Sequence, residues 1–202
     1  MIMLCMSINQ IVLIETDKSK LWVSPDFTPD YMDEFSKLEL NIEPPIFVYG
    51  KKHKHPRNVG FYSDQSIGYR YSGQLMKAKP LFDEKRLQQV LDQTNQSLGT
   101  NFNGILVNQY MNGQHYIGAH GDDERGLDKT GKNMVACISY GAVRKFRIRN
   151  KSDRNIVLDY DHKPCTLLVM EGDFQKEFTH EIPVQKNVKE QRISLTFRHH
   201  TV

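Results

Sequence analysis

Cysteine is scarce in this sequence, and long apolar segments are absent. The 202 residues include three cysteines, Cys5, Cys137 and Cys165, and no two of them lie close together. Secreted disulfide scaffolds need paired cysteines, so this pattern favours a reducing intracellular compartment, nuclear or cytoplasmic. Cys137 and Cys165 lie in strand-like runs, and we interpret them as core thiols. No apolar run approaches the roughly 18 residues that span a bilayer, so we expect no membrane partner.

The start of the chain carries no clear targeting signal. Met1 to Ile14 is mildly apolar, but it lacks a basic leader and a cleavage site, which favours a strand over a signal peptide. The hydrophobic share of 39% and the charged share of 25% are typical of a globular protein. At 202 residues we expect one domain and a monomer, with residues 1–43 as an N-terminal cover.

A strong excess of one charge is also missing, since the net charge is only +3. The basic residues are nevertheless gathered in two clusters. The first combines His53 and His55 with Lys51, Lys52, Lys54 and Arg57, and the second contains Arg144, Lys145, Arg147, Arg149, Lys151 and Arg154. Two clusters on a nearly neutral chain fit contact with phosphate groups. A solvated loop and a solvated strand face explain the same charges equally well.

Helical patterns are confined to the first half of the chain. A short helix is predicted near 29–38, where Pro29-Asp30 would begin it. A second is predicted over 83–98, because Leu87, Val90 and Leu91 recur at helical spacing and Gly99 follows. Both helices would pack outside a core formed by later segments.

Beyond residue 99 the apolar runs have the length and alternation of strands. They lie at 105–107, 134–140, 145–149, 166–170 and 192–198. Strand after strand with short turns predicts an α+β, mainly β fold whose core is a double-stranded β-helix, or jelly roll. We expect this core, with its preceding helix, over 77–202. Residues 44–76, rich in aromatic and turn residues, would form a lid that contains a nucleotide-recognition hairpin.

His120, Asp122 and His180 form a candidate metal site. In His120-Gly121-Asp122 the imidazole and the carboxylate are two residues apart, and residues i and i+2 of an extended strand point to the same face. His180 follows a predicted strand and a turn, where a jelly roll would return a second imidazole to the barrel mouth. Two histidines and one carboxylate on one face are the ligand set of non-haem Fe(II) centres. On spacing alone, ordinary structural histidines remain an equal alternative.

The last predicted strand places Arg192, Ser194 and Arg198 on one face and apolar residues on the other. If the apolar face packs against the helices, the two arginines point into the barrel. Buried arginines are costly without an anionic partner, and a dicarboxylate ligand would supply one. Asn108 and Tyr110, again two residues apart, would add hydrogen-bond donors. The alternative is a surface strand whose arginines are solvated.

Five segments then occur in a characteristic order: Asn108-Gln109-Tyr110, Ile117 to Glu124, Ile138 to Ala142, His180, and Arg192 to Arg198. Together they resemble the AlkB family of Fe(II)- and 2-oxoglutarate-dependent dioxygenases, most of all its duplex-DNA-repairing branch. The resemblance covers roughly residues 44–200. It implies oxidation of N-methyl groups on bases such as 1-methyladenine and 3-methylcytosine, with O2 consumed and aldehyde, succinate and CO2 released.

The resemblance also implies roles for the residues of these motifs. His120, Asp122 and His180 would hold Fe(II). Arg198 and Asn108 would hold the C1 end of 2-oxoglutarate, and its C5 carboxylate would lie against Arg192, Tyr110 and Ser194. The family often carries Asn where Ser194 stands, but a serine hydroxyl can still donate a hydrogen bond.

A substrate side is implied as well. Tyr49 would occupy a hairpin tip and wedge into a base stack, while Lys51, Lys52, Lys54 and Arg57 hold phosphates. Tyr69, Tyr71 and Ser72 would line the pocket for a flipped base, with Tyr71 stacking on it. Asp123 and Glu124 would face a cationic methylated base. The simpler alternatives are core or hairpin packing for the aromatic residues and solvation for the acids.

Three functions fit this sequence. The first is repair of alkylated nucleic-acid bases, in DNA (possibly duplex) or RNA. The second keeps the enzyme but changes its substrate to RNA modification marks or a protein side chain. The third is a non-catalytic nucleic-acid-binding barrel with a structural zinc ion, which three ligands disfavour because such sites usually have four.

Overall fold

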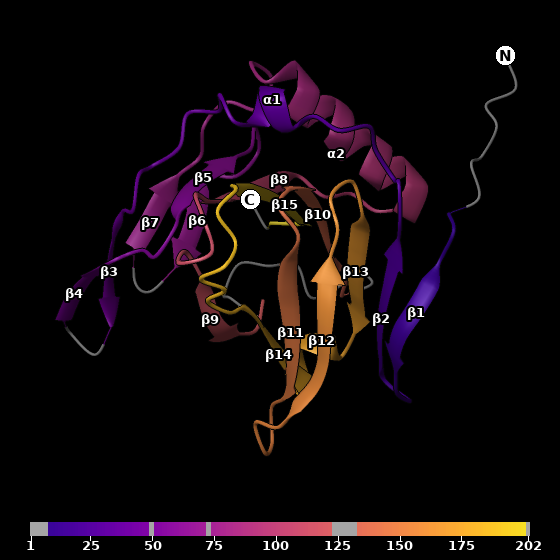
Figure 1. Cartoon of the computed structure of the whole chain (residues 1–202). Coiled ribbons are helices and arrows are strands. Elements are labelled where there is room, and N and C mark those ends of the chain that lie inside the picture. The colour runs from indigo at the N-terminus through magenta and orange to yellow at the C-terminus, as the bar shows by residue number, and fades with distance from the viewer. Residues whose placement is uncertain (1–7, 49–50, 72–73, 123–132, 201–202) are drawn as a thin grey trace, which may run out of the picture.

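The computed structural model describes residues 8–48, 51–71, 74–122 and 133–200. Its largest element is a seven-stranded sheet, and a four-stranded sheet accompanies it (Figure 1). The order of the large sheet is β1 (Ile11–Glu15), β2 (Ser19–Ser24), β13 (Leu167–Gly172), β10 (Val135–Gly141), β15 (Arg192–Arg198), β8 (Gly104–Tyr110) and β5 (Asn58–Tyr62). The order of the small sheet is β12 (Ile156–His162), β11 (Arg144–Asn150), β14 (Phe178–Ile182) and β9 (Ile117–His120).

The two sheets form a jelly-roll core, which confirms the predicted fold class. Many strands that are neighbours in the sheets are distant in sequence, and the described strand pairings are antiparallel, such as β15 with β8 and β10. Residues 1–43 contribute β1 and β2 to one edge of the large sheet, and 44–76 contributes β5 to the other. Both segments thus supply core strands as well as covering elements.

The described residues contain three helices beside the sheets: α1 (Met32–Phe35), α2 (Lys85–Leu98) and α3 (Phe174–Glu177). α1 and α2 lie over one side of the large sheet (Figure 1). The second helix confirms the predicted one and ends at Gly99, whose φ of 62° is a left-handed cap. The first is shorter than the predicted 29–38. Within the described ranges, no helix has the length and apolarity to cross a bilayer.

The last strand divides the molecule into two compartments. Ile193, Leu195 and Phe197 of β15 are fully buried in the cluster that contains Leu87 and Val90 of α2. The alternate side chains of β15 point away from the helices and line a polar pocket between the sheets. The alternation read from the sequence is therefore confirmed. Successive side chains of a strand point to opposite faces. Because the apolar side chains of β15 pack against the helices, the residues between them must point toward the pocket.

Two hairpins project beside this core: β3 (Pro45–Val48) with β4 (Lys51–Lys54), and β6 (Gly68–Tyr71) with β7 (Gln74–Lys77) (Figure 1). Every side chain of β4 is exposed. The predicted wedge Tyr49 and the pocket residue Ser72 lie outside the described residues, as do Asp123 and Glu124. Tyr71 belongs to β6, but its side chain is outside the described part.

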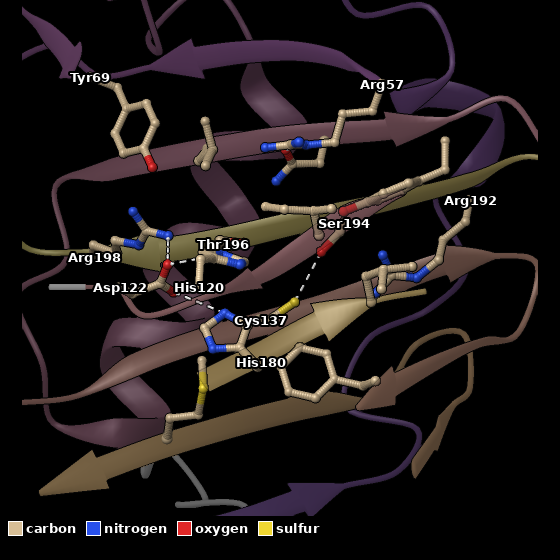
Figure 2. A pocket seen from close by; sticks show the side chains of 17 residues that line it. Arg57, Tyr69, His120, Asp122, Cys137, His180, Arg192, Ser194, Thr196 and Arg198 are labelled. Carbon is tan, nitrogen blue, oxygen red and sulfur yellow. Dashed lines mark hydrogen bonds and ion pairs between the residues drawn. The ribbon is translucent and has the colours of Figure 1, made fainter. Parts of the chain in front are cut away.

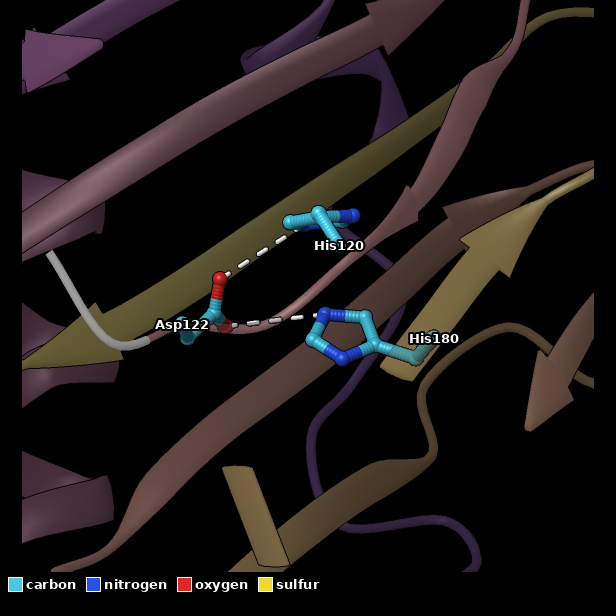
Figure 3. Close-up of side chains that lie close together, drawn as sticks. All are labelled: His120, Asp122 and His180. Atoms are coloured by element: carbon cyan, nitrogen blue, oxygen red, sulfur yellow. Dashed lines mark ion pairs between the residues drawn. The ribbon is translucent and has the colours of Figure 1, made fainter. Parts of the chain in front are cut away.

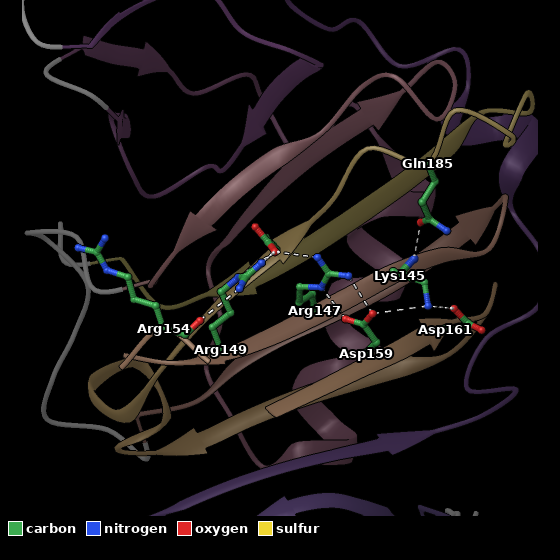
Figure 4. Close-up of polar contacts among 8 residues, drawn as sticks. Lys145, Arg147, Arg149, Arg154, Asp159, Asp161 and Gln185 are labelled. Carbon is green, nitrogen blue, oxygen red and sulfur yellow. Dashed lines mark hydrogen bonds and ion pairs between the residues drawn. The ribbon is translucent and has the colours of Figure 1, made fainter. Parts of the chain in front are cut away.

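Much of the second basic cluster is paired with acidic residues or buried within the protein. Arg147 donates two hydrogen bonds to Asp159 at 2.6 and 2.9 Å, and Arg149 Nη2 lies 2.9 Å from Glu181 Oε1 (Figure 4). These acids belong to β12 and β14, on either side of β11. The small sheet therefore neutralises its own outward charges. Arg144, the first residue of β11, is buried.

Arg144 ties together two loops at one end of the barrel. Its guanidinium donates to the carbonyl oxygens of Asn112, His115 and Pro183 at 3.1, 2.9 and 2.8 Å. Between the same loops, the Gln185 amide donates to the Gly113 carbonyl at 2.7 Å. A Cβ added at Gly113 would lie 1.7 Å from the Gln185 oxygen, which leaves room only for glycine.

The substitution Gly113→Ala should lower the free energy of unfolding by about 1–3 kcal/mol, because the two loops must separate. The matched control is Gly118→Ala in β9, where an added Cβ meets nothing within 4 Å. This control should be neutral or slightly stabilising, since glycine costs about 0.5–1 kcal/mol relative to alanine in a strand. Urea denaturation of both variants measures the difference. Equal stabilities would contradict the close packing of the two loops.

Candidate metal centre

The three predicted ligands converge at the edge of the small sheet. His120 ends β9 and pairs in register with His180 of β14. Asp122 follows two residues after His120. The His120 and His180 Nε2 atoms each lie 3.6 Å from one oxygen of Asp122, and one ligand atom from each residue lies within 4.8 Å of the others (Figure 3). Residues 60 positions apart in sequence thus form one cluster.

Neighbouring groups orient each of these side chains. His120 Nδ1 lies 2.9 Å from the Gly118 carbonyl oxygen, so it carries the proton and leaves the Nε2 lone pair toward Asp122. The His180 ring stacks on Phe146 with centroids 5.2 Å apart and planes at 15°. The Asp122 amide donates to Gln175 Oε1 of α3 at 2.9 Å. Such fixed partners pre-orient ligand atoms.

The protonation states of the cluster suit a cation. Burial lowers the pKa of His120 and lowers the pKa of His180 to about 3, so both imidazoles are neutral near pH 7. Burial acts to raise the pKa of Asp122, but the charge of Arg198, the two neighbouring histidines and the hydrogen bond from Arg198 together outweigh it, and the pKa falls to about 2. Neutral imidazoles and an ionised carboxylate are the forms that bind metals.

The donor set selects among metals. Two imidazole nitrogens and one carboxylate, held on one side, match the facial site of Fe(II), with positions left for other ligands. A structural zinc site usually has four protein ligands. Among the described residues this cluster offers three donors. The residues present therefore fit a non-haem iron better than a structural zinc.

Behind the cluster lies a pocket with cationic walls. The side chains of Arg57, Arg192 and Arg198 line it together with the three candidate ligands (Figure 2). Arg198 Nη2 lies 2.5 Å from Asp122 Oδ1. Arg192 is 1% exposed, and its Nη1 has no hydrogen-bond partner among the described residues. A buried guanidinium with an unpartnered nitrogen points to an anionic ligand.

Comparisons with known proteins agree with this geometry. Residues 25–198 match the model of the 2OG-Fe(II) oxygenase superfamily. The chain is 33% identical to the DNA oxidative demethylase ALKBH2 of Mus musculus, over 81% of this chain and 72% of that protein. This chain belongs to the AlkB family of 2OG-Fe(II) oxygenases. Family membership implies Fe(II), 2-oxoglutarate and O2 as cofactor and co-substrates.

Other AlkB-family proteins are similar over much of the chain. The DNA oxidative demethylase ALKBH2 of Bos taurus is 34% identical over 81% of this chain, and this chain spans 62% of that relative. The solved structure of OsALKBH1 covers 89% of this chain and 97% of its own, with a TM-score of 0.58 and 15% identity. At that identity the likeness supports the fold alone.

The structure places the other predicted residues of the AlkB site as follows. Asn108, Tyr110 and Ser194 are buried and line the pocket. Tyr69 also lines it, with its ring centroid 5.4 Å from the Arg198 guanidinium carbon. Lys51, Lys52 and Lys54 lie apart from the pocket, exposed on β4.

The predicted role of Arg57 in the first basic cluster is wrong. Arg57 was predicted to hold phosphates on the hairpin flank, but it is 3% exposed and donates from Nε to Asn108 Oδ1 at 2.7 Å. The apolar run that follows it, 59–62, was the available signal that Arg57 precedes a buried strand. Cys137 is a buried thiol, as predicted, and it also lines the pocket, with its sulfur 3.0 Å from Ser194 Oγ. The pocket lining therefore includes Arg57 and Cys137, two residues that the spacing of the motifs did not reveal.

Proposed function

We propose that this protein is an Fe(II)- and 2-oxoglutarate-dependent dioxygenase that removes N-methyl lesions such as 1-methyladenine and 3-methylcytosine from nucleic acid. Aldehyde, succinate and CO2 would be the products. The observation that carries the proposal is the convergence of His120, Asp122 and His180 beside the buried Arg192 and Arg198. Metal ligands and anion-binding groups thus share one pocket.

His120, Asp122 and His180 would hold the iron, and the iron when bound would supply activation of O2. The chain's own groups prepare that site. Phe146 fixes the His180 ring by stacking, and Arg198 keeps Asp122 ionised. The ligands and their neighbours are largely buried, so few solvent molecules compete for the positions that co-substrates need.

The co-substrate would lie against the arginines. Arg198 and Asn108 would hold its C1 end, and Arg192, Tyr110 and Ser194 its C5 carboxylate. Support comes from the Arg192 Nη1 atom described above and from the Arg192 guanidinium over the Tyr110 ring at 5.3 Å. Asn108 accepts from Arg57 through its oxygen, so its amide nitrogen remains oriented as a donor. A dianion would balance charge that the fold has already buried.

The nucleic-acid substrate is supported by two observations. Relatives at 33–34% identity are named DNA oxidative demethylases. The exposed strand β4 carries Lys51, Lys52 and Lys54 on the hairpin that it forms with β3, which projects beside the core (Figure 1). Phosphates would contact these lysines, and Tyr49 would wedge into the stack while Tyr71 packs on the flipped base. Tyr69, Ser72, Asp123 and Glu124 complete the proposed contacts with the base.

The test is formaldehyde release from an oligonucleotide with one 1-methyladenine or 3-methylcytosine, in the presence of Fe(II) and 2-oxoglutarate. The wild-type protein should turn over, and His120→Ala should lose at least about 100-fold in rate, because the ligand set would be incomplete. His115→Ala, in a loop outside the cluster, should retain activity. Matched single-stranded and duplex substrates of DNA and RNA separate the alternatives.

Formaldehyde release from methylated RNA or a methylated peptide, but not from methylated DNA, would show that RNA or protein is the substrate instead of DNA. The enzymatic function would be contradicted if the folded, metal-bound protein released no formaldehyde from any of these substrates. Retained activity in His120→Ala would contradict the ligand assignment.

The hairpin lysines give a separate prediction. Replacing Lys51, Lys52 and Lys54 together with alanine should weaken duplex binding and reduce the slope of log affinity against log salt by up to about 3. A matched control replaces Lys18, Lys37 and Lys163 with alanine. These lysines are exposed elsewhere on the protein, so their replacement removes the same total charge. Fluorescence anisotropy between about 50 and 200 mM salt measures both slopes. Identical slopes for the two triple variants would exclude β4 as the phosphate-binding element.

A further inference from the structure

Arg192 is fixed by neutral groups. Its Nε donates to Ser139 Oγ at 2.8 Å, and its Nη2 lies 3.4 Å from His162 Nδ1. The guanidinium carbon lies 5.3 Å from the Tyr110 ring centroid. A further positive charge close by is Arg144, whose pKa is lowered by burial and by Arg192. These contacts hold the guanidinium in place without cancelling its charge.

His162 ends β12 and is fully buried. Its Nε2 lies 3.0 Å from the Thr166 carbonyl oxygen, which can only accept, so Nε2 carries the proton. The Nδ1 lone pair is then directed at Arg192, whose guanidinium can only donate. Burial and the Arg192 charge lower the pKa of His162 to about 3, in agreement with this neutral tautomer. The Phe146 ring, edge-on at 6.1 Å, completes the packing.

We infer that His162 is a positioning residue that aims Arg192 at the distal carboxylate of the co-substrate and, being a neutral acceptor, leaves that arginine's charge available. The inference rests on the proposed function, in which Arg192 binds that carboxylate. An acidic residue at the same place would hold the arginine equally well but would neutralise it. A buried carboxylate would then compete with the ligand for the same donor.

Three variants separate position from charge. His162→Asn keeps a neutral oxygen at the δ position where Nδ1 lies. His162→Asp is nearly isosteric with it but adds a negative charge, and His162→Leu removes the acceptor. The probes are 2-oxoglutarate and 2-oxobutyrate, a 2-oxo acid that lacks the distal carboxylate. Binding of each to the Mn(II)-loaded protein is measured by calorimetry, and KM and kcat are measured with Fe(II).

The Leu variant should bind 2-oxoglutarate about tenfold more weakly, as expected for one lost hydrogen bond to a charged group. The Asp variant should lose at least as much, while Asn should remain within about threefold of wild type. Affinity for 2-oxobutyrate should stay unchanged in all three variants. The turnover defect should appear in KM for 2-oxoglutarate and not in kcat.

Equal affinity of the Asn and Asp variants for 2-oxoglutarate would overturn the inference, and this comparison holds even where the Leu variant fails to fold. Parallel loss of both oxo acids would also overturn it, since that pattern reports general damage to the pocket. Wild-type protein that binds Mn(II) but no 2-oxoglutarate would instead refute the proposed function, and the inference with it.

Discussion

The antiparallel register of β9 and β14 is the constraint on which the site depends. It places His120 opposite His180, and the short extension beyond β9 brings Asp122 against both. A slip of one residue would turn one imidazole to the opposite face of the sheet. Arg144 ties the loop before β9 to the loop after β14, and Phe146 stacks on His180, so both strands of the pair are held in place. Metal chemistry is thus a consequence of strand pairing.

Burial of positive charge is the second organising feature. Arg57, Arg192 and Arg198 enter one pocket, where Asp122 is paired with Arg198. Such an arrangement is costly for an isolated fold, because desolvated guanidinium groups need anions. A dianionic oxo acid bound beside these arginines would offset that cost. The neutral contacts around Arg192, from Ser139 and His162, fit this requirement.

Local patterns in the sequence predicted the metal cluster, the alternating faces of β15 and the helix α2, since each depends on spacing along one element. Their positions in basic stretches predict surface charges for Arg57 and Arg144, yet the fold buries both side chains. The neutralisation of Arg147 depends on its register with Asp159, twelve residues away on β12. The role of His162 depends likewise on which strands meet across the barrel. Pairings of this kind leave no periodic signal in the sequence.

Anomalous diffraction from crystals grown with Mn(II) and 2-oxoglutarate would locate both the metal and the oxo acid. We expect one manganese ion bound by His120, Asp122 and His180, with the oxo acid chelating it and its distal carboxylate on Arg192. A manganese ion bound by other residues, or an oxo acid that leaves Arg192 without a carboxylate partner, would contradict it.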